Sequence, residues 1–552
     1  MDTKMKTRIG MGMTAALCVV LLMNGSPLQS VEGTSVTEGY YPGLDSPLDQ
    51  LNDVYLERGV NAARRFANRH GIVMQGERVQ VVAEAEPSGA DFFVEAAASA
   101  AALAVEDLNG YVETSFRHMV QSMVPIESLQ ALSENAAVEF VRVPLRPFPL
   151  ETSEGVAGTG ADLWHAAYPY RGGGNPVRVC VLDLGFRGYE DLLGTELPAD
   201  TQAVSFRADG DTAAGTVHGT ASAEIIHDMA PNASLVLVNY STDVEHHQAV
   251  DWIIANGVDV VSYSMGWLSA GAGDGTGPIC EDVKKAHEAG VVWISAAGNS
   301  ANHHWHGMFT DRRGDTWHEF DKKNVSNTDY FSFSAEKGEL FSIWLNWDDW
   351  GTWTGSAYAG AEGNDYDLYL YDRSFAILEK SNSKQTQGAL PHESISFKAK
   401  YRGKYYIRIK KRKAPRDCVL EMFFTNASKL EHVVPYSSIN VPADSPHAMA
   451  VGAVGLGDDS AHSYTSLGPT NDQRIKPDLC APAGVSTTTY GKFGFYGTSA
   501  AAAHVAGAVA LLKEKTPYSM EQILAILKAR ARDLGEPGKD NLYGEGRLNL
   551  IK

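Results

Sequence analysis

The sequence is poor in positive charge and in cysteine, and it has little that could cross a membrane. Its 552 residues include 47 Lys and Arg against 67 Asp and Glu, so the formal net charge is −20. An acidic surface repels polyanions, which argues against nucleic acid and anionic membranes as partners. Five cysteines are present, and their spacing matches no zinc motif. Apart from one stretch near the N-terminus, no apolar run is long enough to span a bilayer.

That N-terminal stretch has the layout of a secretory signal peptide. Lys4, Lys6 and Arg8 precede the mostly apolar residues 9–23, and a polar Asn-Gly-Ser-Pro follows. We therefore expect residues 1–30 to be a signal peptide, and the protein to be secreted, in the periplasm or outside the cell, without membrane insertion after its removal. A membrane anchor is the alternative, although the apolar stretch is short for one. Export would permit disulfides, whose pairing the sequence leaves open. The four cysteines concerned are Cys180, Cys280, Cys418 and Cys480.

The most informative segment joins a Gly-Thr-Ser step to a long apolar helix. Gly497, Thr498 and Ser499 lead directly into residues 501–512, which are mostly Ala, Val and Leu. The N-terminus of a helix favours developing negative charge, so Ser499 stands where a nucleophile would be useful. Taken alone, such a step is more often a plain helix cap.

Two further segments supply an acid and a base. Residues 177–183 form an apolar run that ends in Asp183, which predicts a buried parallel strand with a carboxylate at its C-terminal edge. His218 opens a second helical run, residues 221–227. Each residue alone has an ordinary structural interpretation, as a turn former or a core histidine. Together, in the order Asp, His, Ser, they favour a serine triad.

With these residues the chain resembles the subtilisin-like serine proteases, or subtilases, over most of residues 155–552. Ser295-Ala-Ala-Gly-Asn-Ser300 matches the oxyanion segment of that family, and Ser262-Tyr-Ser-Met-Gly266 matches the strand that lines its substrate cleft. Residues 476–484 match the segment before the nucleophile, and residues 543–549 match the C-terminal signature.

The resemblance implies a role for each matching residue. Ser499 would be the nucleophile, His218 the base and Asp183 the group that orients it. Asn299 would donate to the oxyanion. Residues expected to bind substrate are Ser264, Met265 and Gly266, through backbone pairing, and Ala296, Ala297 and Gly298, beside a pocket for an apolar or aromatic side chain.

The sequence departs from the family pattern at three positions near the site. Leu184 follows Asp183 where a small hydroxyl residue is usual, so the carboxylate must find its support elsewhere. Ala500 replaces the usual Met, and Ala503 replaces the usual Pro before His504. None of these changes removes a group that does chemistry; they bear on packing and substrate preference.

The predicted fold class is α/β: a subtilisin-like, mostly parallel sheet flanked by helices, with an N-terminal α+β propeptide-like domain and an inserted antiparallel β-sandwich. The insert is predicted from period-two alternation and resembles a pre-peptidase C-terminal domain. In the N-terminal part we expect strands at residues 79–85 and 137–144, and a helix that Ser128 helps to cap. The expected domains are residues 1–30 (signal), 31–150 (propeptide or inhibitor-like, with a permanent domain as the alternative), 151–302 (catalytic, first part), 303–429 (insert) and 430–552 (catalytic, second part).

The expected chemistry requires no cofactor, and the resemblance leaves structural calcium open. His303, His304 and His306 form a metal candidate or, more commonly, a polar surface loop. Asp365, Asp367 and Asp372 form a calcium candidate or a solvated strand edge.

The sequence therefore predicts a secreted serine endopeptidase that hydrolyses peptide bonds of protein or peptide substrates. It would be made as a self-processing precursor with its own propeptide as intramolecular inhibitor. The proline-containing linker at residues 147–150 would lie in the cleft and be cut near Leu150. The alternatives are a catalytically weak binding or adhesion protein on the same fold and an esterase that uses the same triad.

Overall fold

The computed structural model of the chain describes residues 43–70, 72–85, 91–144, 148–149, 155–168, 176–320, 329–385 and 389–551. All of them belong to one of the two units into which the chain divides, residues 41–552. The expected signal peptide lies outside the described residues. Among the helices that are described, none has the length and apolar character needed to cross a membrane.

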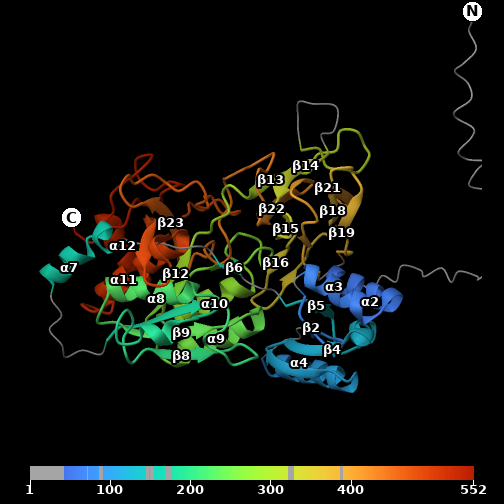
Figure 1. Ribbon diagram of the computed structural model, residues 1–552, viewed down its shortest axis with the longest axis horizontal. Coiled ribbons are helices and arrows are strands. Elements are labelled where there is room, and N and C mark those ends of the chain that lie inside the picture. Colours follow the sequence, from blue (N-terminus) through green and yellow to red (C-terminus); the bar gives the residue numbers. More distant parts are fainter. Residues whose placement is uncertain are drawn as a thin grey trace, which may run out of the picture. The chain divides into compact units, whose positions relative to one another are not determined.

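A seven-stranded parallel sheet is the centre of the fold (Figure 1). The strand order is β24-β23-β12-β10-β7-β9-β8, and every neighbouring pair is parallel. The strands are β7 (Arg178–Asp183), β8 (Gln202–Ser205), β9 (Ser234–Asn239), β10 (Val260–Tyr263), β12 (Val292–Ala296), β23 (Ala448–Gly455) and β24 (Leu479–Ala483). The predicted parallel sheet is thus confirmed.

Helices cover both faces of this sheet, which explains why its strands are apolar throughout. Val179 and Val181 of β7 share a core with α8 (His218–Met229) and α11 (Thr498–Lys513). The alternate residues Cys180 and Leu182 face the core formed with α9 (Asp243–Ala255) and α10 (Pro278–Glu288). Three further helices are α6 (Val156–Thr159), α7 (Ala161–Ala167) and α12 (Met520–Arg530).

Residues 43–144, here called the N-terminal module, form an antiparallel sheet with helices and have a core of their own. The strand order is β1-β2-β4-β3, and β5 pairs with β2. The strands are β1 (Met74–Gln75), β2 (Arg78–Glu84), β3 (Tyr111–Phe116), β4 (Met119–Pro125) and β5 (Phe140–Arg142). The helices are α2 (Ser46–Arg58), α3 (Val60–His70), α4 (Asp91–Asp107), the 3-10 helix η1 (Ile126–Ser128) and α5 (Leu129–Ser133).

The expected cap at Ser128 is wrong. Ser128 does precede α5, but its side chain makes no capping bond, and its hydroxyl instead donates to the carbonyl of Leu108. The 3-10 turn directly before α5 places Ser128 in the helical region of the backbone, whereas a capping residue needs an extended conformation.

Residues 304–425, here called the insert module, form two four-stranded antiparallel sheets. Their orders are β13-β22-β15-β20 and β14-β21-β18-β19, and the buried side chains of both sheets form one core. The first sheet holds β13 (His304–Met308), β15 (Leu340–Trp347), β20 (His392–Lys398) and β22 (Val419–Thr425). The second holds β14 (Phe331–Ala335), β18 (Asp365–Tyr371), β19 (Ile377–Ser381) and β21 (Gly403–Lys413). A small ribbon is made by β16 (Thr352–Trp353) and β17 (Tyr358–Ala359).

Polar contacts join the N-terminal module to α9, which covers the central parallel sheet, and to the insert module. The buried Arg142 guanidinium bonds Glu84 of its own module at 2.6 Å and Asp243 of α9 at 2.5 Å. On the other side, the Gln50 amide donates to the carbonyl of Lys380 at 2.7 Å, and the Ser46 N–H donates to the Ser383 hydroxyl at 3.0 Å.

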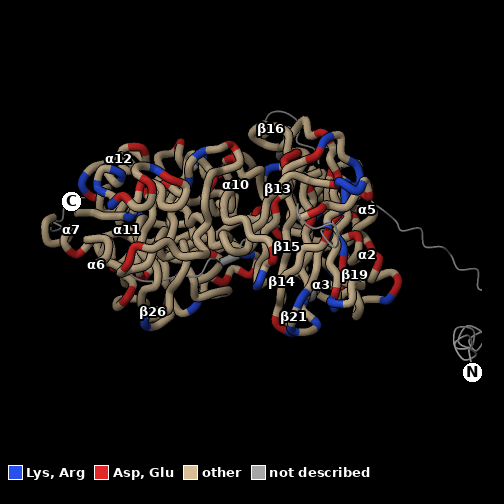
Figure 2. Tube along the Cα trace, turned by 90° about the horizontal axis from the view of Figure 1, so that it is seen from above, with Lys and Arg blue, Asp and Glu red and all other residues tan. Residues whose placement is uncertain are grey.

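Acidic and basic residues are interspersed along the described chain (Figure 2). Even the basic end of β21 is partly neutralised, because Lys411 pairs with Asp417 and Arg412 with Asp367. These basic residues therefore do not create a large region of positive surface potential.

The contact between Arg142 and Asp243 yields a prediction for stability. Arg142→Met keeps the length of the side chain but leaves the buried Asp243 carboxylate without its cationic partner, which should cost about 3–5 kcal/mol. Chemical denaturation should detect this loss in protein carrying Ser499→Ala, so that the self-processing expected from the sequence cannot shorten the chain. Arg58→Met is the control, because Arg58 and Glu57 form an exposed pair worth about 0–1 kcal/mol. Equal effects of the two variants would contradict the prediction.

Candidate active site

Asp183 and His218 meet at the C-terminal edge of the sheet. Asp183 ends β7 and is fully buried, and its Oδ2 lies 2.6 Å from Nδ1 of His218, the first residue of α8. The other carboxylate oxygen accepts the backbone N–H of Leu184 at 2.7 Å. That amide provides support for the carboxylate where Leu184 lacks a hydroxyl.

Gly219 allows this close approach of helix and strand. A Cβ atom at Gly219 would lie 2.8 Å from Cβ of Asp183 and 2.4 Å from a ring carbon of Phe186. Both separations are too short for any side chain, so the position next to His218 must be glycine for the imidazole to reach the carboxylate.

Ser499 is the second residue of α11 and is buried at its N-terminus. Gly497 precedes the helix with φ +113°, a conformation that favours glycine. The Ser499 hydroxyl donates to the carbonyl of Ser264 at 3.5 Å, and the Ser264 hydroxyl donates to the carbonyl of Ser499 at 3.4 Å. The expected nucleophile therefore adjoins the segment expected to bind substrate.

Asn299 is held by Thr498, the residue before the serine. Its Oδ1 accepts the backbone N–H of Thr498 at 3.0 Å and the Thr498 hydroxyl at 3.1 Å. These two bonds identify the oxygen of the Asn299 amide and turn its NH₂ group away from Thr498. The sequence reasoning gave Thr498 no role; its place in the Gly-Thr-Ser step was the available signal.

The three small residues before Asn299 are buried at the end of β12. Ala297 donates to the carbonyl of Val451 and accepts from the N–H of Asn440. Gly298 has φ +115°, and a Cβ there would lie 2.3 Å from Oδ1 of Asn440. The backbone of this segment is therefore fixed by its neighbours. That Ala296, Ala297 and Gly298 border a substrate pocket stays a prediction.

A second chain segment lies along the expected substrate strand. β11 (Met265–Gly266) pairs antiparallel with β6 (Phe148–Pro149), so that Met265 is opposite Pro149 and Gly266 is opposite Phe148. These two residues belong to the linker that was expected to enter the cleft. The expected cleavage position, Leu150, lies outside the described residues.

The three histidines after Asn299 are not a surface loop, as the commoner interpretation held. His304 begins β13 and is fully buried, with its ring nitrogens near the carbonyl of Val434 and the carboxylate of Glu421. His303 bonds the carbonyl of Ala427. Pairing of β13 with β22 draws this segment into the insert module and gives its imidazoles separate partners.

The three aspartates of the insert module are not a solvated edge either. Asp365 and Asp367 are buried in β18, and burial, with the neighbouring Asp367, raises the pKa of Asp365 to about 7. Asp372 forms a turn by accepting from Ser374 and Ala376. Within the described ranges, these three do not form a metal-binding group.

Within that same part of the chain, one group has metal-ligand chemistry: His246, His247 and Asp282. The sequence reasoning missed it. The adjacent histidines were a visible signal, but nothing in the sequence placed Asp282 beside them.

The chain is similar to known proteins both in sequence and in fold. A sequence model of the subtilase family matches residues 174–329 and 426–546, together just over half of the chain. "Extracellular serine protease" of Serratia marcescens is 54% identical over 55 residues, which are 10% of this chain and 5% of that protein. "Subtilisin BL" of Lederbergia lenta is 40% identical over 114 residues, 20% of this chain and 40% of that protein. The chain thus spans less than half the length of these relatives.

A solved structure supports the fold. The Clostridium perfringens CspB protease superposes with a TM-score of 0.50 at 14% identity, covering 72% of this chain and 98% of that one.

The parallel sheet and the matching sequence define a protein of the subtilisin-like fold. The chain belongs to the subtilase family.

The site yields a first prediction about activity. Ser499→Ala should reduce peptide hydrolysis to background while the thermal midpoint stays unchanged, because it removes one hydroxyl and adds no bulk. A fluorophosphonate probe should label the parent protein and not the variant. Ser486→Ala, which changes a serine outside the site, should still be labelled. Full turnover or labelling in purified Ser499→Ala would overturn the assignment.

Proposed function

We propose that the protein is a secreted serine endopeptidase that cuts peptide bonds with Asp183, His218 and Ser499. The observation that carries this proposal is the antiparallel pairing of β6 with β11. It aligns an extended peptide with the strand that follows Ser264, the residue in contact with Ser499. Backbone pairing of this kind serves peptide recognition, and an esterase of small substrates does not require it.

The bond between Asp183 and His218 supports the proposed triad. Because the carboxylate lies 2.6 Å from Nδ1, that nitrogen carries the proton and Nε2 keeps its lone pair. His218 can then take the proton of Ser499 as the hydroxyl attacks a peptide carbonyl, and return it to the departing amine. Asp183 keeps the imidazole in this tautomer and stabilises the imidazolium.

The oxyanion would be held by the Asn299 amide and the backbone N–H of Ser499. Thr498 occupies the amide oxygen of Asn299, so the NH₂ group is left to face developing charge without rotation. The N–H of Ser499 lies in the first turn of α11, at the positive end of the helix. Both donors are thus oriented before the reaction begins, which is the source of their effect.

We propose that the N-terminal module is a propeptide that inhibits the enzyme in cis. The described residues that follow it, Phe148 and Pro149, pair with the strand where substrate would pair. Its contact with α9 combines an ion pair with a small apolar cluster of Val82, Met119 and Val244, which suits a part that leaves without exposing a large apolar face. Retention as a permanent domain is the alternative, and the N-terminal sequence of the secreted protein separates the two.

We propose that the insert module is a β-sandwich domain inserted into the catalytic domain, of the type that resembles pre-peptidase C-terminal domains. The supporting observations are its two antiparallel sheets around one core and the interruption of the family match between residues 329 and 426. Secretion is supported by the similarity to the extracellular serine protease of Serratia marcescens.

Asn299→Ala tests the oxyanion role. Loss of one oriented donor should lower kcat about 100- to 1,000-fold with little change in KM, the size of effect known for such a donor in subtilisin. Steady-state kinetics on a small peptide decide the matter. A raised KM at constant kcat would make Asn299 a substrate-binding residue instead.

The position of β6 leads to a prediction about maturation. The wild-type chain should cut itself near Leu150, because the linker already lies on the substrate strand beside Ser499. Edman sequencing or mass spectrometry of the secreted protein should find a new N-terminus at about residues 150–155, and Ser499→Ala should remain uncut. An active, uncut precursor, or a mature start far from this linker, would refute the proposal.

A further inference from the structure

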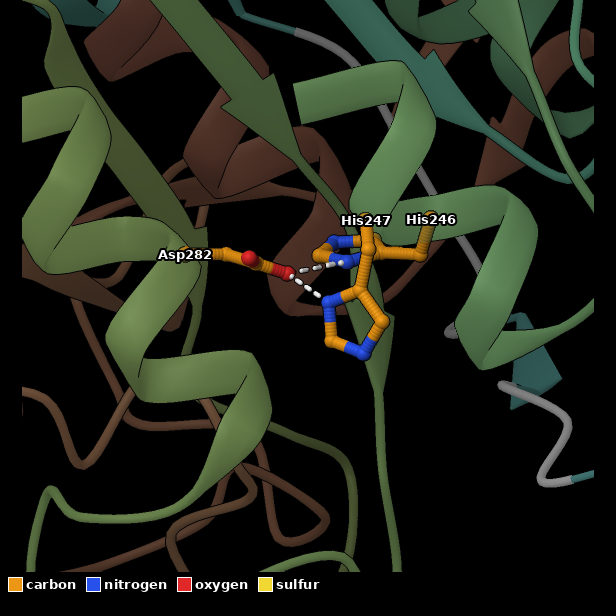
Figure 3. A group of neighbouring side chains, drawn as sticks. All are labelled: His246, His247 and Asp282. Atoms are coloured by element: carbon orange, nitrogen blue, oxygen red, sulfur yellow. Dashed lines mark hydrogen bonds and ion pairs between the residues drawn. The ribbon is translucent and has the colours of Figure 1, made fainter. Parts of the chain in front are cut away.

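His246, His247 and Asp282 form a buried group on the face of the sheet covered by α9 and α10 (Figure 3). The two histidines are consecutive on α9, and Asp282 belongs to α10. Their Nδ1 atoms lie 3.0 Å and 2.5 Å from the same carboxylate oxygen, Oδ2 of Asp282. Consecutive helical residues point about 100° apart, so this convergence depends on Asp282 standing between them.

The carboxylate of Asp282 needs positive charge. It is buried, and the ion pairs described for it are both with imidazoles. Two neutral imidazoles would leave an unneutralised anion in the core.

The surroundings of His246 indicate which of its nitrogens carries the proton. Its ring stands edge to face against four aromatic rings, with interplanar angles from 64° to 78°. Those rings belong to Tyr240, Tyr263, Trp267 and Trp293. In the described part of the chain its Nε2 has no hydrogen-bond partner. Aromatic faces attract the positive edge of a ring and repel a lone pair, so they favour a proton on Nε2.

If Nδ1 of His246 donates to Asp282 as Nδ1 of His218 does to Asp183, its Nε2 lone pair is left among these aromatic rings without a donor. A cation bound at Nδ1 instead moves the proton to Nε2, the arrangement that the aromatic rings favour. The Nε2 of His247 is likewise buried without a partner among the described residues, so neither histidine has a second hydrogen bond that fixes its proton on Nδ1. One divalent cation would satisfy both imidazoles and neutralise the carboxylate.

We propose that Nδ1 of His246, Nδ1 of His247 and the carboxylate of Asp282 bind a divalent transition metal ion, and that zinc is the ion they suit. Two imidazoles and one carboxylate are a common zinc donor set, whereas calcium and magnesium prefer oxygen ligands. The three donor atoms lie within 4.8 Å of one another. Tetrahedral zinc would separate them by about 3.3 Å, so small side-chain rotations suffice.

The site would have a structural role. It joins α9 to α10, and α9 is the helix that the N-terminal module contacts. Phe116 of that module stacks on His247 with ring centroids 4.7 Å apart, and Arg142 bonds Asp243 at the start of α9. An ion held here would fix the surface on which the module rests and would be shielded from solvent while the module is bound.

Metal analysis of the full chain tests the proposal. The protein is produced with Ser499→Ala in zinc-supplemented medium and purified without a metal column or chelator, so that failure of the proposed proteolysis does not affect the result. Elemental analysis should find about one zinc per chain. Removal of the ion should lower the thermal midpoint, and added Co²⁺ should give the visible absorption of a tetrahedral complex.

Variants locate the ion. His247→Gln and Asp282→Asn should both lose the zinc, while His287→Gln should retain it, because His287 lies on the same helix as Asp282 but pairs with Glu521. His247→Cys keeps a ligand at the position and guards against loss of folding. Its Co²⁺ form should show an added thiolate-to-cobalt charge-transfer band. Two outcomes would overturn the site. One is that the protein with all three residues intact binds neither zinc during zinc-supplemented growth nor Co²⁺ on refolding. The other is that all the variants contain equal amounts of zinc.

Discussion

The structure depends on the close packing of α11 against α8 and the central sheet. From Thr498 to Leu512 all fifteen residues of α11 are buried, and seven of them are alanine. Gly507 allows α8 to approach, because a Cβ there would lie 2.3 Å from Cβ of Met229. Small side chains thus bring the N-termini of two helices to one edge of the sheet, where Ser499 and His218 stand. Larger residues at these positions would separate the two helices, and the site with them. The replacements Ala500 and Ala503 fit this constraint, since both lie fully buried in the same helix.

The sequence predicted the parts of the fold whose signals are local. The apolar run ending in Asp183 became β7, and the segment after Ser499 became α11. The alternating runs on which the insert was predicted all fall within strands: residues 331–334, 341–345, 367–371, 394–397 and 405–409. The sequence reasoning missed α4, whose alanine-rich residues 96–104 lack a polar face and so give no clear helical period. It also missed the positions of His304 and Asp365, because burial there is decided by strands far away in the sequence. The expected triad needed only motifs, whereas the group around Asp282 needed the packing of α10 on α9, which no motif encodes.

The interiors of the three modules differ in polarity from the interfaces between them. The N-terminal module, the central parallel sheet and the insert module each have an apolar core, while the N-terminal module meets α9 through a buried ion pair, hydrogen bonds and only a small apolar cluster. A buried ion pair such as that of Arg142 and Asp243 adds little net stability, because desolvation offsets most of the attraction, but a misplaced partner is strongly penalised. Such an interface gives one defined orientation without the affinity of a large apolar face. That combination suits the proposed propeptide role, in which the module docks in one register and is then released.

Helix α9 links the central sheet, the N-terminal module and the group around Asp282, because it contacts all three. Its inner side covers the sheet, and its N-terminus is closed by a capping box between Thr242 and Glu245. The N-terminal module uses the same two residues, since Gln121 bonds the Thr242 hydroxyl at 2.5 Å and the Glu245 carboxylate at 3.3 Å. One turn further along, His246 and His247 reach Asp282. A shift of α9 would therefore disturb the cap, the docked module and the histidine group together. Because β9 ends immediately before α9, and its last residue Asn239 is opposite Asp183 in the sheet, the rigidity of this helix bears directly on the edge where the expected catalytic residues meet.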